Sequence, residues 1–282
     1  MGWADVPVSH LGSLWKEAAL FQEAEELARL LPDLIEQDQQ LDIIGGAAGC
    51  IAGLLSLYAV APSPTMLELA TRCGEHLLAR AHPMQTGIGW KIPQQEIPLT
   101  GFAHGAAGIA LSLLRLAAVS RDERFRHAAL AAMAYERSLF SPERDNWPDL
   151  RTFRTTAQGS QANEQKEPQF MVAWCHGAPG IGLARLASLP YADDAAIRQE
   201  IAAALQTTKT QGITAEQSLC HGTAGNLEML LVASQTLETP PIHEIMRQHS
   251  PALLECVPAV VEQKVPSLPI KPLGLMTGLA GI

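Results

Sequence analysis

Two segments of the chain carry residue types that bind transition metals. Cys175 lies in the segment WCHGAPGIG, and Cys220 and His221 lie in the segment LCHGTAGN. Thiolate and imidazole are ligands that Zn²⁺ prefers, and a catalytic zinc site has three protein ligands and one open position. Cys175, Cys220 and His221 would therefore supply a Cys₂His zinc site. The alternative is that both cysteines merely pack at the starts of helices.

Two further histidines lie in related segments. His104 is part of GFAHGAAG, and His176 follows Cys175 directly. His104 has no metal-binding neighbour in its segment, which favours a role in acid–base catalysis. His176 is either an active-site residue or a histidine that hydrogen-bonds the backbone of a tight turn.

One acidic residue, Asp42, lies in the similar segment LDIIGGAAG. An acid shortly before a helix commonly interacts with the positive end of the helix dipole. Alternatively, the Asp42 carboxylate could orient a histidine on the other side of the site.

All these residues precede a repeated signature, Gly-x-x-Gly at the start of an apolar run. It occurs five times, at Gly46/Gly49, Gly105/Gly108, Gly177/Gly180, Gly222/Gly225 and Gly278/Gly281. Glycines suit places where helix starts crowd together. We therefore expect the repeated turns, and the residues just before them, to gather at one end of the fold.

Each signature opens a pair of predicted helices, the first apolar all round and the second amphipathic. The second helices bury Met66, Leu69, Cys73 and Leu77 in one case and Ile197, Ile201 and Leu205 in another, all at helical spacing. Ser63 and Pro64 are expected to start the first of these helices, and the acidic pair Asp193 and Asp194 the second. A further amphipathic helix is expected from about Glu17 to Leu31. This alternation predicts an all-α fold, an α/α toroid with inner and outer helices.

Two regions depart from the alternation. The polar stretch Ser141–Phe170 predicts a long surface loop. The fifth signature is followed directly by Ile282, and the first residues resemble the tail of an earlier helix. We therefore expect one toroid domain over 1–282 that lacks the first and last parts of the ring. Such a chain would expose apolar faces and be poorly soluble or weakly active alone.

Composition narrows the class of protein. Hydrophobic residues make up 47% and aromatic residues 5% of the chain, which favours helices over sheets. The net charge of −9 disfavours nucleic acid as a partner. No membrane span or signal peptide is apparent. An odd count of five cysteines argues against a disulfide framework, so we expect a cytoplasmic protein with Cys73 and Cys256 as core residues.

The segments GFAHGAAG, WCHGAPG, LCHGTAG and GLMTGLAG, in this order, resemble the motifs of lanthionine cyclases. These occur as stand-alone enzymes and as the C-terminal domain of class II lanthipeptide synthetases, and NWPDLR is more similar to the fused type. The resemblance implies a dehydrated precursor peptide as substrate and a dehydratase domain as partner in a full-length synthetase. Nothing in the chain resembles the kinase-like dehydratase half, so no ATP use is expected.

Residue by residue, the resemblance makes Cys175, Cys220 and His221 the zinc ligands. It makes His104 the active-site acid–base and Asp42 the active-site aspartate.

The resemblance also places His176 where the family has another active-site residue. One position departs from the pattern. Stand-alone cyclases have an arginine four residues before the first zinc cysteine, and this chain has Met171 there. The role of that arginine would be absent or would be supplied elsewhere, for example by Arg151.

The implied reaction adds a substrate cysteine thiolate to dehydroalanine or dehydrobutyrine and forms a lanthionine or methyllanthionine ring. Two other functions compete with this one. A carbohydrate-active α/α toroid would need two carboxylates that face each other, whereas the motifs offer only Asp42. A non-catalytic, decayed fragment would keep the fold and the zinc without the reaction.

Overall fold

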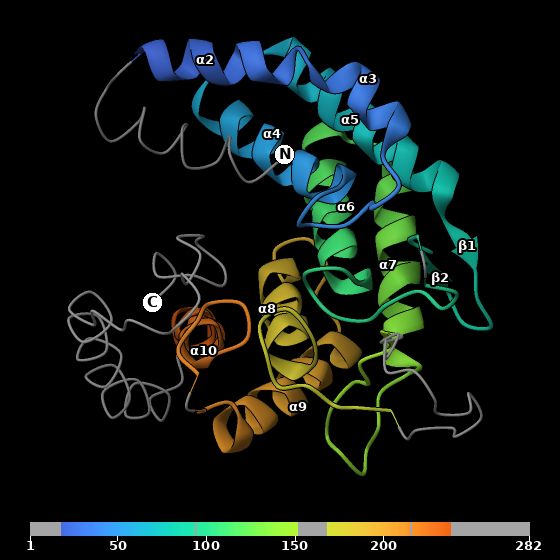
Figure 1. The fold of residues 1–282 in the computed structure, drawn as a ribbon, viewed down its shortest axis with the longest axis vertical. Helices are drawn as coiled ribbons and strands as arrows, with labels where there is room; N and C mark the ends of the chain where they lie inside the picture. Colours follow the sequence, from blue (N-terminus) through green and yellow to red (C-terminus); the bar gives the residue numbers. More distant parts are fainter. Residues whose placement is uncertain (1–17, 94, 152–167, 215, 238–282) are drawn as a thin grey trace, which may run out of the picture. The chain divides into compact units, whose positions relative to one another are not determined.

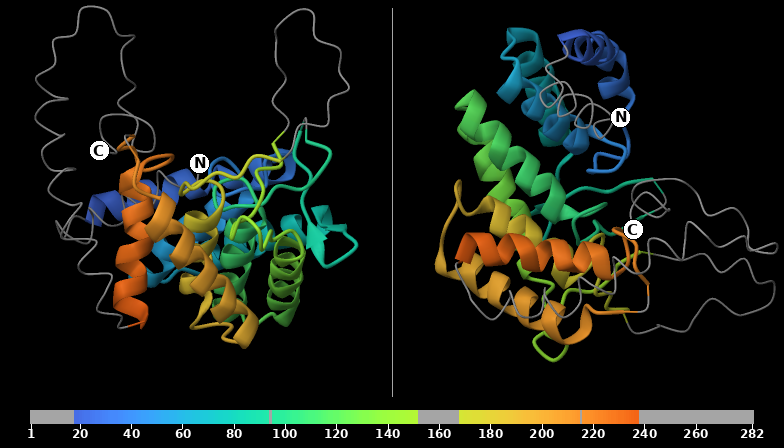
Figure 2. Two further views of the ribbon diagram at one scale, coloured as in Figure 1. Left: turned by 90° about the horizontal axis from the view of Figure 1, so that it is seen from below. Right: turned by 90° about the vertical axis from the view of Figure 1, so that its left-hand side faces the viewer.

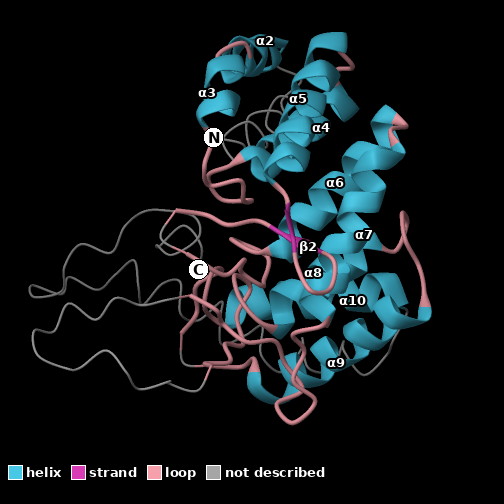
Figure 3. Cartoon of the chain, turned by 90° about the vertical axis from the view of Figure 1, so that its right-hand side faces the viewer, coloured by secondary structure: helices cyan, strands magenta, loops and turns pink. Residues whose placement is uncertain are grey.

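The computed structural model describes residues 18–93, 95–151, 168–214 and 216–237, and these residues are mainly helical (Figures 1 and 3). The helices are α2 (Ala18–Ala28), α3 (Leu31–Gln37), α4 (Ala47–Val60), α5 (Pro64–Arg80), α6 (Ala106–Ser120), α7 (Glu123–Arg137), α8 (Ala178–Ser188), α9 (Ala195–Gln211) and α10 (Thr223–Leu237). The short strands β1 (His82–Pro83) and β2 (Ile88–Gly89) pair antiparallel. The described helices fall into two compact units, α2 to α7 with the strands and α8 to α10.

Four of the five glycine signatures begin a helix, as predicted. Helices α4, α6, α8 and α10, here called the glycine-turn helices, start one residue after Gly46, Gly105, Gly177 and Gly222. The fifth signature and Cys256 lie outside the described residues. So do residues 1–17 and 238–282, on which the expectation of an incomplete ring depends.

The predicted alternation of apolar and amphipathic helices is present in both units. In the first unit, α4 packs against α5 and α6, and α6 packs against α7. In the second unit, α8 packs against both α9 and α10 (Figure 2). The predicted stripes are buried, with Met66, Leu69, Cys73 and Leu77 on α5 and Ile197, Ile201 and Leu205 on α9.

Cys73 is a core residue, as expected. Its side chain is fully buried, and the Cys50 thiol on α4 lies next to it. A hydrogen bond with Cys50, together with burial, raises the pKa of the Cys73 thiol far above its usual range. The thiol therefore stays protonated and unreactive.

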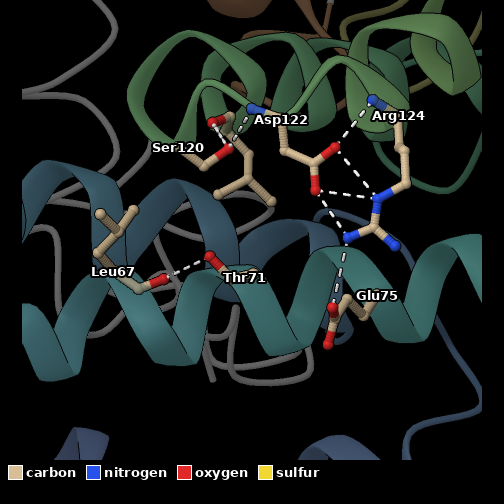
Figure 4. Close-up of polar contacts among 7 residues, drawn as sticks. Leu67, Thr71, Glu75, Ser120, Asp122 and Arg124 are labelled. Atoms are coloured by element: carbon tan, nitrogen blue, oxygen red, sulfur yellow. Dashed lines mark hydrogen bonds and ion pairs between the residues drawn. The ribbon is translucent and has the colours of Figure 1, made fainter.

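Capping residues start two of the amphipathic helices. The Asp194 side chain accepts a backbone hydrogen bond at the start of α9, and Asp122 accepts one from the Arg124 N–H at 3.0 Å at the start of α7. The Arg124 side chain also binds the Asp122 carboxylate at 2.7 Å and reaches Glu75 on α5 at 3.5 Å (Figure 4). This exposed network connects the start of α7 to α5.

Two predicted helices are present, each with one difference in detail. The helix expected from about Glu17 to Leu31 corresponds to α2, which ends earlier, at Ala28, and a separate helix, α3, begins at Leu31. Pro32 favours this new start, since its fixed φ and missing N–H suit a first helical turn. Helix α5 begins at Pro64 with Ser63 at its cap position, as predicted, but the Ser63 side chain makes no capping hydrogen bond.

The polar stretch Ser141–Phe170 is non-helical where the structure describes it, but part of it is not a surface loop. Asn146, Trp147 and Asp149 are 2%, 0% and 7% exposed. The Asn146 Oδ1 accepts the Ala178 N–H at 2.8 Å, in the first turn of α8. Burial is favourable because the Trp147 ring presents a large apolar surface and the Asn146 amide is hydrogen-bonded.

No helix among the described residues is both long and apolar enough to span a bilayer.

Candidate functional site

The predicted site residues lie in the loops that precede the glycine-turn helices, and three of these loops share one backbone hydrogen bond. In each, an N–H at the start of the helix donates to the carbonyl seven residues earlier. The pairs are Ala48 with Leu41, Ala106 with Leu99 and Thr223 with Glu216. Each loop thus folds back over the first turn of its own helix, which holds the intervening residues at that helix start.

The second glycine of the signature permits this close approach. A Cβ atom at Gly49, Gly180 or Gly225 would collide with the backbone carbonyl oxygen six residues earlier. A side chain at these positions would push the loop off the helix. The repeated glycines are therefore what the loop geometry requires.

In the second unit, the two cysteine loops lie side by side. The Cys175 N–H donates to the Cys220 carbonyl at 3.2 Å. One ligand atom each from Cys175, Cys220 and His221 lies within 4.8 Å of the other two, and the Cys220 Sγ is 3.9 Å from the His221 Nε2. The structure thus brings together the three residues that the sequence singled out as metal ligands.

The donor atoms suit a zinc ion. With Zn–S near 2.3 Å and Zn–N near 2.0 Å, tetrahedral ligands lie about 3.5–3.8 Å apart. The 3.9 Å separation of Cys220 and His221 is close to this, and small side-chain rotations would close the wider separation of up to 4.8 Å. Two thiols and one imidazole form a three-ligand set, the number found in catalytic zinc sites.

Polar contacts fix the loop that carries Cys220 and His221. The Ser218 Oγ donates to the Glu216 Oε1 at 2.9 Å and accepts the His221 N–H at 3.4 Å. The Gly222 N–H donates to the Ser218 carbonyl at 3.0 Å. Together these bonds form a tight turn at the start of α10.

An aromatic pair packs beside the cysteine loops. The rings of Phe102 and Trp174 meet edge to face, with centroids 4.9 Å apart, and both residues are buried. A Cβ at Gly180 would lie 2.9 Å from the Phe102 Cβ, and one at Gly225 would lie 2.8 Å from the Trp174 Cβ. The signature glycines therefore also make room for these side chains.

In the first unit, Asp42 binds His104. The Asp42 Oδ2 lies 2.7 Å from the His104 Nδ1, and the Asp42 Oδ1 accepts the Gly45 N–H at 2.8 Å. The Asp42 side chain is 2% exposed and that of His104 is 35% exposed. The carboxylate thus holds the ring so that the Nε2 is on the side away from Asp42. Of the two roles left open for Asp42, the contact with His104 is the one expected of a carboxylate that orients a histidine, and the contact with the Gly45 N–H is the one expected near a helix start.

His176 is placed differently from His104 and His221. It is 1% exposed, and its carbonyl accepts the Ala173 N–H at 3.1 Å. Its side chain therefore belongs to the interior of the loop that carries Cys175.

The two residues connected with the missing arginine lie in different units. Met171, in the second unit, accepts a hydrogen bond from the Asn146 side chain at its carbonyl, at 2.9 Å. Arg151, in the first unit, makes a two-point ion pair with the buried Asp149, at 2.9 and 2.6 Å. Whether Arg151 replaces the arginine stays a prediction.

Some residues that build these loops were not found from the sequence. Asn146 caps α8, and the Asp38 Oδ2 accepts the Ala47 N–H at 2.7 Å and caps α4. Each lies many residues before the helix that it caps, whereas capping motifs are local. For Asn146, the one available signal in the sequence was the polar segment NWPDLR that contains it.

Solved structures share the fold of this chain. It matches a nisin cyclase with a TM-score of 0.50 and 14% identity, over 100% of this chain and 85% of the other. It matches the Lin0763 protein of Listeria innocua with a TM-score of 0.58 and 13% identity, over 94% and 75%. It matches the GH76 α-mannanase BT2949 of Bacteroides thetaiotaomicron with a TM-score of 0.51 and 14% identity. In that case the match covers 70% of this chain and spans 53% of the mannanase.

At these identities the matches establish the fold alone, which is an all-α toroid. The family is established by a sequence model described as "Lanthionine synthetase C-like protein", which matches residues 6–282. The glycine signatures and the cysteine and histidine motifs all lie within this range. The chain therefore belongs to the lanthionine synthetase C-like family.

Proposed function

We propose that this chain is a zinc-dependent peptide cyclase. It adds the thiolate of a substrate cysteine to dehydroalanine or dehydrobutyrine in a dehydrated precursor peptide and forms lanthionine or methyllanthionine. The observation that carries the proposal is the convergence of Cys175, Cys220 and His221 from two loops, in a member of the lanthionine synthetase C-like family.

In this proposal Cys175, Cys220 and His221 hold the metal. A zinc ion with an open position favours the thiolate form of an entering thiol at neutral pH. Ser218 supports the ligand set by fixing the backbone of His221, and the hydrogen bond from Cys175 to Cys220 keeps the two thiols adjacent. The buried His176 positions the Cys175 loop.

The chemistry assigns a task to His104. When the substrate sulfur bonds to the alkene β-carbon, the π electrons move to the α-carbon and its carbonyl. The α-carbon must then accept a proton, and no group leaves. We assign this proton transfer to His104 through its Nε2, with Asp42 orienting the ring through the Nδ1. His104 immediately precedes the first glycine of its signature, as His221 does in its own.

The motifs also support a place in a longer reaction sequence. NWPDLR and AWCHGAPGIG are similar to the cyclase domain of fused class II synthetases. We therefore propose that a dehydratase domain, which converts Ser or Thr to the dehydroamino acid, supplies the substrate of this chain.

The test measures zinc and cyclisation together. The full chain is incubated with a peptide that contains one cysteine and one dehydroalanine, and loss of the free thiol without change of mass reports the thioether. Cys220→Ala should lose both zinc and activity, whereas the matched control Cys50→Ala, at a cysteine outside the cluster, should keep both. Full zinc occupancy in Cys220→Ala would refute the ligand assignment. Zinc without any thioether in the unmodified chain would favour the non-catalytic alternative.

A further inference from the structure

The first unit contains a second candidate site, a cavity of about 240 Å³ near the end of α5. Its lining residues are Gln39, Leu41, Arg80, His82, Lys91 and Pro93. Arg80 is the last residue of α5, His82 the first of β1, and Lys91 follows β2 (Figure 1). We call this cavity the basic pocket, because three of its six lining residues are basic and none is acidic.

The two permanent cations of the basic pocket are available to a ligand. Arg80 and Lys91 are exposed, and neither forms an ion pair with any residue in the part of the chain that the structure describes. The two acids closest to Leu41 in the sequence are engaged elsewhere: Asp38 directs its carboxylate to backbone N–H groups, among them those of Leu41 and Ala47, and Asp42 directs its own to Gly45 and His104. The pocket is therefore positively charged.

The charge of the whole chain makes this pocket distinctive. With a net charge of −9, the surface as a whole repels anions. An anion is therefore attracted where unpaired cations gather. A guanidinium such as that of Arg80 can bind a carboxylate through two parallel N–H groups.

The basic pocket adjoins the proposed acid–base pair. Leu41 lines the pocket, and the next residue, Asp42, holds His104. Leu41 has a φ of 63°, in the left-handed region that a leucine rarely adopts, and it is 1% exposed. The backbone is thus fixed in an unusual turn that places one residue at the pocket and its neighbour at the proposed catalytic histidine.

We propose that the basic pocket binds the carboxylate of an acidic residue in the substrate peptide, outside the residues that form the ring. The identification of the ligand as the substrate rests on the proposed cyclase function. Leu41 and Pro93 give the pocket apolar walls that suit the methylene groups of a glutamate side chain, and the Arg80 and Lys91 cations suit its carboxylate. A free phosphate would use the cations and not the apolar walls.

The experiment compares two fluorescein-labelled peptides that lack cysteine and dehydroalanine, one with three glutamates and the other with three glutamines. Their dissociation constants for the full chain are measured by fluorescence anisotropy. The glutamate peptide should bind about tenfold more tightly, and this preference should weaken as salt is added.

Substitutions test whether the preference for the glutamate peptide arises in the basic pocket. The double variant Arg80→Gln/Lys91→Gln should bind both peptides alike. The matched control Arg29→Gln/Arg198→Gln removes the same charge from two exposed ion pairs and should keep the preference.

Three outcomes would overturn the inference. They are equal binding of both peptides to the unmodified chain, an unchanged preference in the pocket variant, and binding of inorganic phosphate without any preference between the peptides. Because the labelled peptides cannot react, the result is independent of turnover. Selective binding without thioether formation would refute the proposed cyclase and not the pocket, whereas cyclisation without selective binding would refute the pocket alone.

Discussion

Replacing Asp42 by asparagine tests whether Asp42 and His104 act as one unit. The Asp42 Oδ1 accepts the Gly45 N–H at 2.8 Å, and the Oδ2 lies 2.7 Å from the His104 Nδ1. In Asp42→Asn only the amide oxygen can accept the Gly45 N–H, so the amide nitrogen takes the place that faces His104. That nitrogen can only donate. The His104 Nδ1 must then accept, and the ring proton moves to the Nε2.

The consequence for catalysis follows from this change of tautomer. In the unmodified chain the Nδ1–H donates to the carboxylate, so the Nε2 can take up and deliver a proton, and the carboxylate offsets the positive charge of the protonated ring. The variant has the opposite tautomer and no compensating charge. A positioned acid–base group contributes about 10²–10⁴-fold to a rate. We therefore expect Asp42→Asn to slow cyclisation by about 10²-fold or more.

The assay measures kcat for a peptide with one cysteine and one dehydroalanine, with zinc content as a second readout. Asp42→Asn and His104→Ala should both keep their zinc, because the proposed metal ligands lie in other loops. The double variant should be no slower than His104→Ala alone, since both changes remove the same proton transfer. Turnover of Asp42→Asn within about threefold of the unmodified chain, or additive losses in the double variant, would refute this reasoning.

Two further predictions concern stability. Arg185 is fully buried and its Nε donates to Glu200 at 2.7 Å, so Glu200→Ala removes a charged partner from a buried guanidinium. This substitution should destabilise the chain by about 3–5 kcal/mol and lower Tm by roughly 10 °C. The control Asp193→Ala, which removes an exposed ion pair, should hardly change Tm. Equal shifts of Tm in the two variants would contradict the prediction. The pKa of Tyr135 is raised from 10.0 to about 12, mainly by burial and secondly by the negative charge of Glu136. As the pH rises, the unfolded chain therefore loses this proton before the folded chain does. The free energy of unfolding should consequently fall between pH 10 and pH 12. Urea unfolding across this pH range should show that the free energy of unfolding falls less steeply in Tyr135→Phe than in the unmodified chain. Identical slopes in the two proteins would count against the prediction.

The parts of the fold that depend on local chemistry could be predicted from the sequence. Gly49, Gly180 and Gly225 are glycines because the preceding loop returns to the first turn of the helix, and this need recurs wherever the loop recurs. The convergence of Cys175, Cys220 and His221 was predictable for the same reason. Cys175 and Cys220 occupy equivalent positions in equivalent loops, so the repeat by itself predicts that the two thiols converge.

Contacts between distant residues could not be predicted in this way. Asp42 and His104 are 62 residues apart, and the sequence left the role of Asp42 open. Asn146 caps α8 from 32 residues away, and no rule of local capping identifies such a partner. Trp147 lies in a stretch whose average polarity indicated a surface loop, yet its indole is fully buried. A single large apolar side chain outweighed the polar composition around it.

The backbone torsion of the first glycine further distinguishes the loops. Gly46 and Gly105 begin their helices with extended backbone, at φ values of −124° and −119°, whereas Gly177 has a φ of 83°. The residue before Gly105 is His104, whose side chain is 35% exposed, and the residue before Gly177 is His176, which is 1% exposed. A left-handed glycine redirects the chain on either side of it, so the same position in the signature presents one histidine to solvent and buries the other. Position in the repeat thus predicts where a histidine lies along the chain, whereas the exposed His104 and the buried His176 differ in the torsion of the glycine that follows.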